Sequence, residues 1–569
     1  MSGKRVATSF LAAAMAVGTL SSAAFAENGT VDPADLNWEK PEETINISVY
    51  AGEGDQEEFL ADENGGKAVM DEWLLENLNV TFDWQYMTGD MTERLNLMLA
   101  DNSYPSVITN MPDDMAEKFI AQGKAVDLTE YLDDMPNLTR RMGDYINMLK
   151  DDEGHIYKLS TLWGENPNVA GLDFGVRWDY YLELGEEKMY ETPQEYIEVM
   201  KKILANHPTN DAGQTTYAFT SDNQGKSFLN AMLGAYGFIN GYKLNEETGE
   251  FTHWLNTDEG LEIAKLVNQM YREGLIDPDY QSVDYETYIS KLANGQVLGN
   301  FGTWWYAWVG GHQTWAVQEG DDYDKNKRFA NVSVHGEGMS MEDTSLLTSN
   351  YVGSYRMIIT DKATEEEIQG IVKYLNWEAS ELGTFIMGFG APREENVWKI
   401  DDDGTWLFDD EIMNVDTKDT TYHTVKNHYA CEYWVAICGQ WLKSDGRSVF
   451  DKIDPRVDRV SIYDYWPVNE DGSFADEGIN ICWGNYTAPA KDTTMYQTTF
   501  NSRDTIATIK QMVDDTITSS WAEIINSASE DDCIAAFEAA RDNCNAMGLE
   551  ELTDYYENSY KANVEKYEG

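Results

Sequence analysis

The sequence predicts an α/β fold that begins with an open, mostly parallel sheet. Strand-like and helix-like patterns alternate in β-α-β-α-β order between residues 45 and 109, and this order favours parallel strands joined by crossover helices. The composition, 42% hydrophobic and 12% aromatic, is typical of a globular protein. The length of 569 residues allows about two to four domain-sized units.

The first 26 residues predict a signal peptide rather than a part of the fold. Lys4 and Arg5 precede a short apolar run at residues 10–20, and an Ala-x-Ala cleavage site ends at Ala26. The run is too short to span a bilayer, and no later apolar segment is long enough. We therefore expect an exported protein, with residues 27–43 as a flexible leader. No cysteine follows the apolar run, so no lipid-modified N-terminal cysteine is expected.

Each early element has a sequence signal. Residues 45–50 (INISVY) alternate between apolar and polar side chains, as a strand does. A helix, a strand, a second helix and a third strand are expected at residues 59–78, 79–86, 91–100 and 105–109. Ligands of such sheets bind beyond the carboxyl ends of the strands. This edge places Tyr50, Asp55 and Asp113 at the mouth of a predicted cleft.

The central part of the chain predicts mixed elements. Residues 151–159 resemble a hairpin, and Pro193 is well placed at the first position of a helix that continues to residue 204. Further helices are expected at residues 258–273, before Gly274, and in the segment that ends at residue 293. Residues 356–359 predict another strand.

The charge of the chain excludes some partners. The formal net charge is −60, and it becomes −62 without Lys4 and Arg5, the only charges of the signal peptide. Nucleic acids and anionic membranes would repel such a protein. A neutral or cationic ligand is favoured instead.

The cysteines leave two alternatives open. All five lie in the last quarter of the chain, and none forms a C-x-x-C motif. An odd number leaves at least one thiol unpaired within the chain. Cys533 and Cys544 either pair across neighbouring helices or remain buried free thiols.

Residues 297–308 (VLGNFGTWWYAW) are the strongest candidate for a ligand contact. They begin like a strand, and the aromatic residues Trp304, Trp305, Tyr306 and Trp308 follow. Because side chains alternate between the faces of a strand, we expect that these rings do not all enter one core. Exposed rings with a polar edge suit a sugar. The alternative is an aromatic cluster within the core or between lobes.

No cofactor, metal or catalytic residue is predicted. The seven histidines are scattered, and His423 and His428 are five residues apart, which disfavours zinc. Residues 401–404 and 469–472 resemble calcium turns but lack an oxygen ligand at the first position, so acidic turns are expected. The sequence has no G-x-S-x-G elbow and no glycine-rich phosphate loop.

Several motifs occur together in a characteristic order and spacing. They include GKAVDLTEYLDDMPN (123–137), HIYKL (155–159), VRWDYYLELG (176–185), YREGLIDPDY (271–280), GQVLGNFGTWW (295–305) and the segments 375–406 and 531–562. In this order they resemble the extracellular solute-binding proteins, family 1, of bacterial ABC transporters for carbohydrates. The resemblance covers nearly the whole mature chain.

The resemblance implies two lobes that are not contiguous in sequence. Lobe one would comprise residues 44–162 and 345–391, and lobe two residues 163–344 and 392–569, with a hinge and a ligand cleft between them. The implied function is capture of an oligosaccharide for the permease subunits of the transporter, without enzymatic activity. Two features depart from the family. The lipobox cysteine is missing, and the loop 206–217 has too few oxygen ligands for the calcium that relatives often bind.

The resemblance also suggests site residues. Trp163 would lie at the crossing into lobe two, and Trp304 would correspond to a tryptophan of the cleft. Arg177 either holds sugar hydroxyls or pairs with Asp179. Trp178 is a candidate additional platform for a sugar ring. Further candidates are Trp305, Tyr50, Asp55, Asp113 and Trp483 with its neighbour Tyr486.

A secreted carbohydrate-active enzyme is the alternative function. Glycosidases need two carboxylates at a suitable separation, and a sequence with 101 acidic residues does not exclude such a pair. The order of the motifs favours transport.

Overall fold

The computed structural model describes a large part of the chain. The described residues are 37–51, 66–86, 90–161, 173–185, 189–302, 304–319, 324, 326–330, 332–353, 355–380, 382–383, 386–387, 398–400, 406–408, 491–500 and 504–569. The predictions about the signal peptide, the acidic turns at 401–404 and 469–472, and the cysteines Cys431, Cys438 and Cys482 lie outside these residues.

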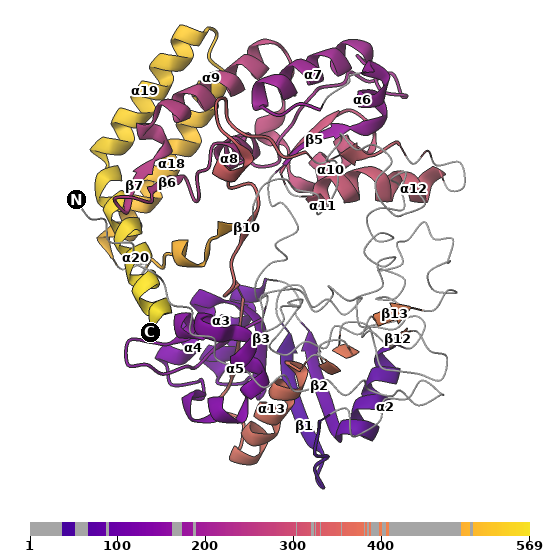
Figure 1. Cartoon of the computed structure of the whole chain (residues 1–569), viewed down its shortest axis with the longest axis vertical. Coiled ribbons are helices and arrows are strands. Elements are labelled where there is room, and N and C mark those ends of the chain that lie inside the picture. The colour runs from indigo at the N-terminus through magenta and orange to yellow at the C-terminus, as the bar shows by residue number, and fades with distance from the viewer. Residues whose placement is uncertain are drawn as a thin grey trace, which may run out of the picture.

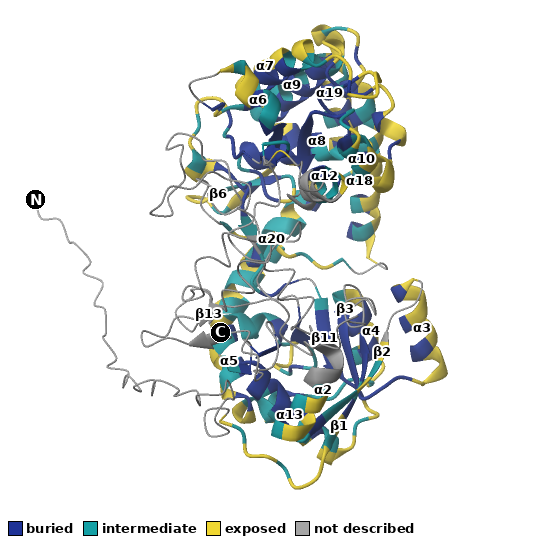
Figure 2. Cartoon of the chain, turned by 90° about the vertical axis from the view of Figure 1, so that its right-hand side faces the viewer, coloured by how far each residue is buried: buried dark blue, intermediate teal, exposed yellow. Residues whose placement is uncertain are grey.

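The described residues form two lobes (Figure 1). Lobe one, at the bottom of Figure 1, consists of residues 37–161 and 355–387, and its core draws on both segments. Lobe two, at the top, consists of residues 173–346 and 504–548, which also share one core. In Figure 2 the buried residues gather inside each lobe, whereas exposed residues cover the outer faces. The lobe limits outside the described residues stay a prediction.

Lobe one is built on a five-stranded sheet in the order β2-β1-β3-β11-β4. Its strands are β1 (Ile45–Ala51), β2 (Val80–Tyr86), β3 (Val107–Pro112), β4 (Leu159–Ser160) and β11 (Tyr355–Ile359). β1 pairs in parallel with β2 and β3, as the β-α-β-α-β order predicts. β11 pairs antiparallel with both β3 and β4, so a strand from a distant part of the chain completes the sheet.

The helices of lobe one begin at recognisable sequence signals. The Asp90 side chain caps α3 by accepting a bond of 2.7 Å from the Glu93 amide. Thr364 and Glu367 form a capping box at the start of α13. The helices are α2 (Gly66–Leu78), α3 (Met91–Asp101), α4 (Asp113–Ala121), η1 (Thr129–Asp134), α5 (Pro136–Met142), η2 (Gly143–Leu149) and α13 (Glu365–Glu378).

Lobe two surrounds a three-stranded antiparallel sheet in the order β8-β5-β9. The strands are β5 (Asp173–Arg177), β8 (Gly299–Gly302), β9 (Phe329–Ala330) and the hairpin β6 (Tyr242–Asn245) and β7 (Glu250–His253). The helices are α6 (Trp178–Leu184), α7 (Pro193–Asn206), α8 (Lys226–Ala235), η3 (Trp254–Asn256), α9 (Asp258–Arg272), η4 (Tyr280–Ser282), α10 (Tyr285–Ala293), α11 (Trp304–Ala307), η5 (Trp308–His312), α12 (Gln313–Glu319) and η7 (Met341–Asp343). A separate antiparallel pair joins β12 (Trp398–Ile400) and β13 (Trp406–Phe408).

The C-terminal helices complete lobe two and reach lobe one. α18 (Thr505–Ile525) and α19 (Glu530–Ala546) contribute to the core of lobe two. The Trp521 indole donates a bond of 2.9 Å to the Gly225 carbonyl. α20 (Leu549–Glu568) runs along the side of both lobes in Figure 1, and its C-terminal end lies against lobe one.

The central segments between the lobes pair with each other. Residues 347–353 and 491–500, here called the connecting segments, contain β10 (Thr348–Ser349) and β14 (Lys491–Asp492), which form a parallel pair. The short helix η9 (Thr494–Tyr496) follows β14. We therefore identify these segments as candidate hinge strands.

The structure corrects two expectations and decides between two alternatives for a pair of cysteines. Residues 151–159 form a turn closed by the Asp151 amide and the His155 carbonyl, at 2.8 Å, and not a hairpin. Residues 304–307 form a helix, so the argument from strand alternation does not apply to their rings. Cys533 and Cys544 are buried free thiols on the same helix, α19. Eleven positions of a helix span about 16 Å, which is too far for a disulfide.

Among the helices that the structure describes, none is both long and apolar enough to cross a bilayer.

Gly260 leaves almost no room for a side chain. A Cβ at this position, near the start of α9, would lie 2.0 Å from the Trp254 carbonyl oxygen. Alanine raises helix propensity by about 1 kcal/mol, but a forced shift of a packed backbone costs about 1–3 kcal/mol. We expect Gly260→Ala to lower the melting temperature measured by calorimetry.

The control is Glu538→Ala, which places an alanine on the exposed side of α19. It should change the free energy of unfolding by less than about 0.5 kcal/mol. A Gly260→Ala variant as stable as the parent would show that α9 and η3 can move apart without cost.

Candidate ligand-binding site

The predicted site residues fall into three groups. Asp55, Trp163, Trp483 and Tyr486 lie outside the described residues. The backbones of Trp304 and Trp305 open α11, but their side chains are not described. The roles of these residues stay predictions. The placed side chains are those of Tyr50, Asp113, Arg177, Trp178 and Tyr306.

Tyr50 lies near the carboxyl end of β1. Its side chain is 2% exposed and packs into a cluster of lobe one with residues from β3, α3 and α4. Its hydroxyl is buried and has no hydrogen-bond partner among the described residues. Burial raises the pKa of this hydroxyl, so it stays protonated and can donate a hydrogen bond. A buried hydroxyl donor without a hydrogen-bond partner, as at Tyr50, lowers the free energy of unfolding.

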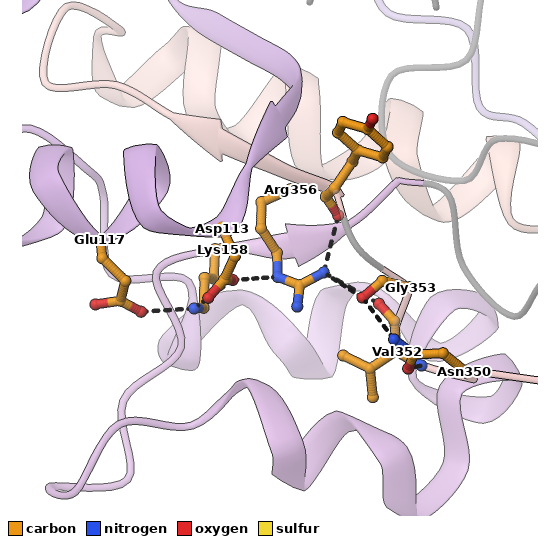
Figure 3. Close-up of polar contacts among 8 residues, drawn as sticks. Asp113, Glu117, Lys158, Asn350, Val352, Gly353 and Arg356 are labelled. Atoms are coloured by element: carbon orange, nitrogen blue, oxygen red, sulfur yellow. Dashed lines mark hydrogen bonds and ion pairs between the residues drawn. The ribbon is translucent and has the colours of Figure 1, made fainter. Parts of the chain in front are cut away.

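Asp113 is the first residue of α4 and directly follows β3. Its Oδ1 atom lies 2.5 Å from Arg356 Nε and 2.7 Å from Lys158 Nζ, as Figure 3 shows. Lys158 Nζ also lies 2.5 Å from Glu117 Oε1. The carboxylate therefore has two cationic partners of its own, and its remaining exposure of 33% leaves limited room for a ligand.

Arg356 extends this network to a connecting segment (Figure 3). Its Nη1 atom donates to the carbonyl oxygens of Val352, Gly353 and Tyr355 at 3.2, 3.0 and 2.9 Å. A single guanidinium thus binds the segment after β10 to Asp113, at the edge where β3 ends. The forked geometry of arginine suits such a multiple contact.

The charges of this network change the pKa of Asp113. Burial alone would raise it, but the nearby Arg356 and Lys158 cations outweigh burial and lower the pKa below its ordinary value. Asp113 is therefore a stabilising ionised partner in the folded protein. Its predicted role as an acceptor for sugar hydroxyls stays a prediction.

Arg177 is a buried side chain of lobe two, 2% exposed. Its Nε and Nη2 atoms donate to both oxygens of Asp179, at 2.9 and 2.6 Å. The guanidinium carbon also lies 4.2 Å from the ring centre of Tyr180 and 4.5 Å from that of Trp315. Burial opposes the charge, but Asp179 holds the pKa of Arg177 above its ordinary value. These contacts favour the structural pair over a contact with sugar.

Trp178 begins α6 and is 3% exposed. Its ring stacks on Tyr181 with 5.5 Å between ring centres and 12° between planes. The ring thus lies in the core of lobe two, and this placement weighs against its use as a sugar platform.

Tyr306 shows how one ring of the aromatic stretch is used. Its hydroxyl donates a bond of 2.7 Å to Asp222 Oδ2. Its ring lies 5.3 Å from the ring centres of both Tyr285 and Tyr288. Burial raises the pKa of the hydroxyl, and the Asp222 carboxylate raises it further. Tyr306 thus packs α11 against α10, in agreement with the alternative that these aromatic residues form a cluster within the core.

The loop 206–217 uses its own polar groups. Asn210 Oδ1 accepts from the amides of Ala212 and Gln214, at 3.1 and 2.9 Å. Asn210 Nδ2 donates to the Gln214 side chain and to the Asn294 carbonyl, at 2.9 and 2.8 Å. These bonds stabilise the turn.

A cavity of about 410 Å³ lies beside the connecting segment 491–500. The hairpin β6–β7, β14, η9 and α20 line it. Tyr50, Asp113, Arg177, Trp178 and Tyr306 are not among its lining residues.

Sequence reasoning missed the partners of the predicted residues. Lys158 was visible only as part of the motif HIYKL, and Arg356 only as part of a strand. The distance in sequence between Asp113 and Arg356 explains the omission, because no local pattern joins two residues 243 positions apart. Trp315 also gave no signal of its role beside Arg177.

Comparison with known proteins supports the same fold. No protein-family model matches the sequence. Over 246 residues the sequence is 24% identical to the fructooligosaccharide ABC transporter substrate-binding protein FusA of Streptococcus pneumoniae serotype 4. This match covers 41% of the present chain and 45% of FusA, so it spans less than half the length of that relative.

Solved structures match over much more of the chain. A FusA EF-hand mutant of S. pneumoniae in complex with fructo-nystose has a TM-score of 0.59 at 17% identity, covering 91% of this chain and 99% of that chain. An HMO-binding, ABC-transporter-associated solute-binding protein from Bifidobacterium longum infantis has a TM-score of 0.58 at 17% identity, with the same coverage. An extracellular solute-binding protein from B. longum subsp. infantis reaches 0.60 at 16% identity and covers 93% and 100%.

These likenesses confirm the predicted fold class. The chain has the α/β fold of these solute-binding proteins, and its described residues form two lobes. At these identities the likeness concerns the fold.

The Asp113 network predicts a pH-dependent contribution to stability. The lowered pKa of Asp113 means that the folded state resists protonation of this carboxyl. Its contribution is therefore complete above the ordinary value of 3.8 and is lost as the pH falls through the lowered value. We expect Asp113→Asn to cost about 1–3 kcal/mol at neutral pH. Below pH 3.8 the difference from the parent should shrink.

Urea unfolding at several pH values would measure this difference. The matched control is Asp114→Asn, because Asp114 pairs with Lys118 at 3.5 Å on an exposed surface, with 70% of its side chain accessible. Exposed ion pairs of this kind contribute little to the free energy of unfolding. A cost of Asp113→Asn that did not change with pH would refute the electrostatic account.

The Arg177 pair predicts a loss of stability without a loss of charge. Arg177→Lys keeps the positive charge, but lysine cannot donate to both oxygens of Asp179 or lie flat between Tyr180 and Trp315. Losing one charge-assisted hydrogen bond costs about 1.5–3 kcal/mol. Thermal unfolding should therefore shift to lower temperature.

Arg541→Lys makes the same chemical change at an exposed pair with Asp542, whose side chain is 70% accessible. It should leave the unfolding temperature close to that of the parent. If Arg177→Lys kept full stability but bound ligand weakly, Arg177 would be a ligand contact.

Proposed function

We propose that this chain is an extracellular solute-binding protein that captures an oligosaccharide and delivers it to the membrane permease of an ABC transporter. The observation that carries the proposal is the two-lobed fold, which the chain shares over 91% of its length with a relative solved in complex with fructo-nystose. The ligand, the permease and the location outside the cell belong to the proposal.

The arrangement of the lobes supports a site between them. The parallel strands β1 and β3 end at the edge of lobe one that carries Asp113, and ligands of such sheets bind beyond this edge. α11, with Trp304 and Trp305, lies on the side of lobe two that faces lobe one (Figure 1). A ligand that touched both lobes would favour their closure.

The chemistry of the chain supports a neutral sugar. Aromatic rings bind the apolar faces of a sugar, and polar side chains bind its hydroxyl groups. A formal charge of −60 would repel an acidic polysaccharide and leaves neutral oligosaccharides as the preferred class. A secreted carbohydrate-active enzyme is not proposed, since the relatives that match the fold are binding proteins by name.

Calorimetric titration with a panel of neutral oligosaccharides would test the proposal. We expect heat from binding at a ratio of one to one, and no new reducing ends after prolonged incubation. Release of reducing ends would replace the proposal with an enzyme. Absence of binding across fructans, milk-type glycans and glucans would refute the ligand class.

Trp304 is the residue on which the proposal depends most. If its ring stacks on a sugar, Trp304→Ala removes a contact worth about 1.5–3 kcal/mol. The affinity for the sugar found in the panel should then fall about 10- to 100-fold, while the melting temperature of the free protein stays near that of the parent. Titration calorimetry and thermal unfolding measure the two quantities.

Trp304→Phe should recover part of the affinity, because it keeps an aromatic face. The control is Trp38→Ala, since Trp38 packs on Trp377 within lobe one, with 6.4 Å between ring centres. It should leave the affinity unchanged. Normal binding by a Trp304→Ala variant of low stability would place Trp304 in the core.

A further inference from the structure

Tyr145 touches every described segment that joins the two lobes. It lies in η2 of lobe one. Its ring stacks on Tyr351, with 5.0 Å between ring centres and 28° between planes. Its ring also lies 4.9 Å from the ring centre of Tyr567. Its hydroxyl donates a bond of 2.8 Å to Asp492 Oδ2.

The three partners come from different links between the lobes. Tyr351 follows β10 in the connecting segment 347–353, and Asp492 belongs to β14 in the segment 491–500. Tyr567 lies at the end of α20. One side chain of lobe one thus contacts two candidate hinge strands and the C-terminal helix.

α20 connects these contacts to lobe two. Its Tyr556 lies 4.6 Å from the ring centre of Tyr242, and its Tyr560 lies 5.4 Å from that of Phe251. At its other end, the Tyr567 carbonyl accepts a bond of 3.1 Å from Asn147 in η2. The helix therefore contacts both the β6–β7 hairpin of lobe two and η2 of lobe one.

The two connecting segments are also bonded to each other beside Tyr145. Across the two segments, the Tyr351 amide donates to Thr494 Oγ1 at 2.8 Å. Within the segment 491–500, the Thr494 amide donates to Asp492 Oδ1, also at 2.8 Å. Thr494 is fully buried. The bond between Tyr351 and Thr494 and the β10–β14 pair therefore join the two connecting segments next to Tyr145.

Rotation of the lobes must disturb these contacts. If lobe two turns about the connecting segments, the end of α20 moves relative to η2, and the Tyr145 ring loses or changes its neighbours. Contacts that exist only over a narrow range of angles bias the population toward that range. Burial, with the Asp492 bond, raises the pKa of the Tyr145 hydroxyl, so it remains a donor at physiological pH.

We propose that Tyr145 is a positioning residue that sets the angle between the lobes in the free protein and, through that angle, the affinity for the sugar. The effect on affinity rests on the proposed function, whereas the effect on the angle does not. Tyr145 need not touch the sugar, because the apparent affinity follows the fraction of molecules already in the binding-competent arrangement.

Small-angle X-ray scattering of the free protein tests the first step. Tyr145→Ala removes both ring contacts and the hydrogen bond, and it should change the radius of gyration. Tyr145→Phe keeps the rings and should change it less. The control is Tyr131→Ala, because among the described residues the Tyr131 hydroxyl bonds to Glu365 of lobe one, at 3.1 and 3.2 Å. It should leave the scattering curve of the parent unchanged.

Titration of the same variants with the sugar found in the panel tests the second step. Losing the two ring pairs should shift the population of lobe angles by about 5- to 150-fold. The dissociation constant should rise and fall together with the radius of gyration. A variant with a smaller radius of gyration should bind more tightly, and one with a larger radius should bind more weakly.

The outcomes separate the two proposals. An unchanged radius for Tyr145→Ala, with a folded protein, overturns the positioning role. A changed radius with no sugar bound by any variant supports the positioning role and refutes the proposed function. A variant with a smaller radius of gyration that binds the sugar more weakly, or one with a larger radius that binds it more tightly, also overturns the proposal. If Tyr145→Ala does not fold, Tyr567→Ala removes one ring contact at the chain end and must itself change the radius.

Discussion

The antiparallel pairing of β11 with β3 and β4 is the constraint on which the rest of the structure depends. β11 completes the sheet of lobe one, although residues 173–346, between β4 and β11, build lobe two. The chain must therefore leave lobe one and return to it. This return brings the β10 segment, Arg356 and Tyr351 beside lobe one, and it places the connecting strands where a rotation of the lobes would act.

Local patterns predicted the local part of this structure. Alternation of side chains identified β1, and the parallel order of β1 to β3 followed from the helices between them. Pro193 and the position of Gly274 also marked α7 and α9 near their true limits. The return of β11 to lobe one was expected only from the resemblance. No local pattern predicted its place between β3 and β4, because strand order depends on pairing between distant residues. The argument for the aromatic residues after Gly302 assumed the alternation of a strand, but residues 304–307 form a helix. Four residues are too few to distinguish a helical pattern from a strand pattern.

The structural partners of the candidate site residues were harder to predict than the fold, for an electrostatic reason. The chain has 41 basic and 101 acidic residues, so a single acid in the sequence says little about its role. The cations are more informative in the structure. Arg177 and Arg356 are both at most 8% exposed, and each holds a carboxylate and further neighbours. In such an acidic chain, a buried arginine identifies which of the many carboxylates has a structural partner.

The last helices also determine when each lobe can be finished during synthesis. Lobe one contains all of its described core residues by position 387, whereas the core of lobe two needs Trp521 and Ile525 from α18. A chain that emerges from the ribosome or from a translocation channel N-terminus first exposes the apolar face of α9 until α18 arrives. The connectivity thus gives the two lobes different folding times: lobe one can fold once residue 387 has emerged, and lobe two only after α18 has emerged.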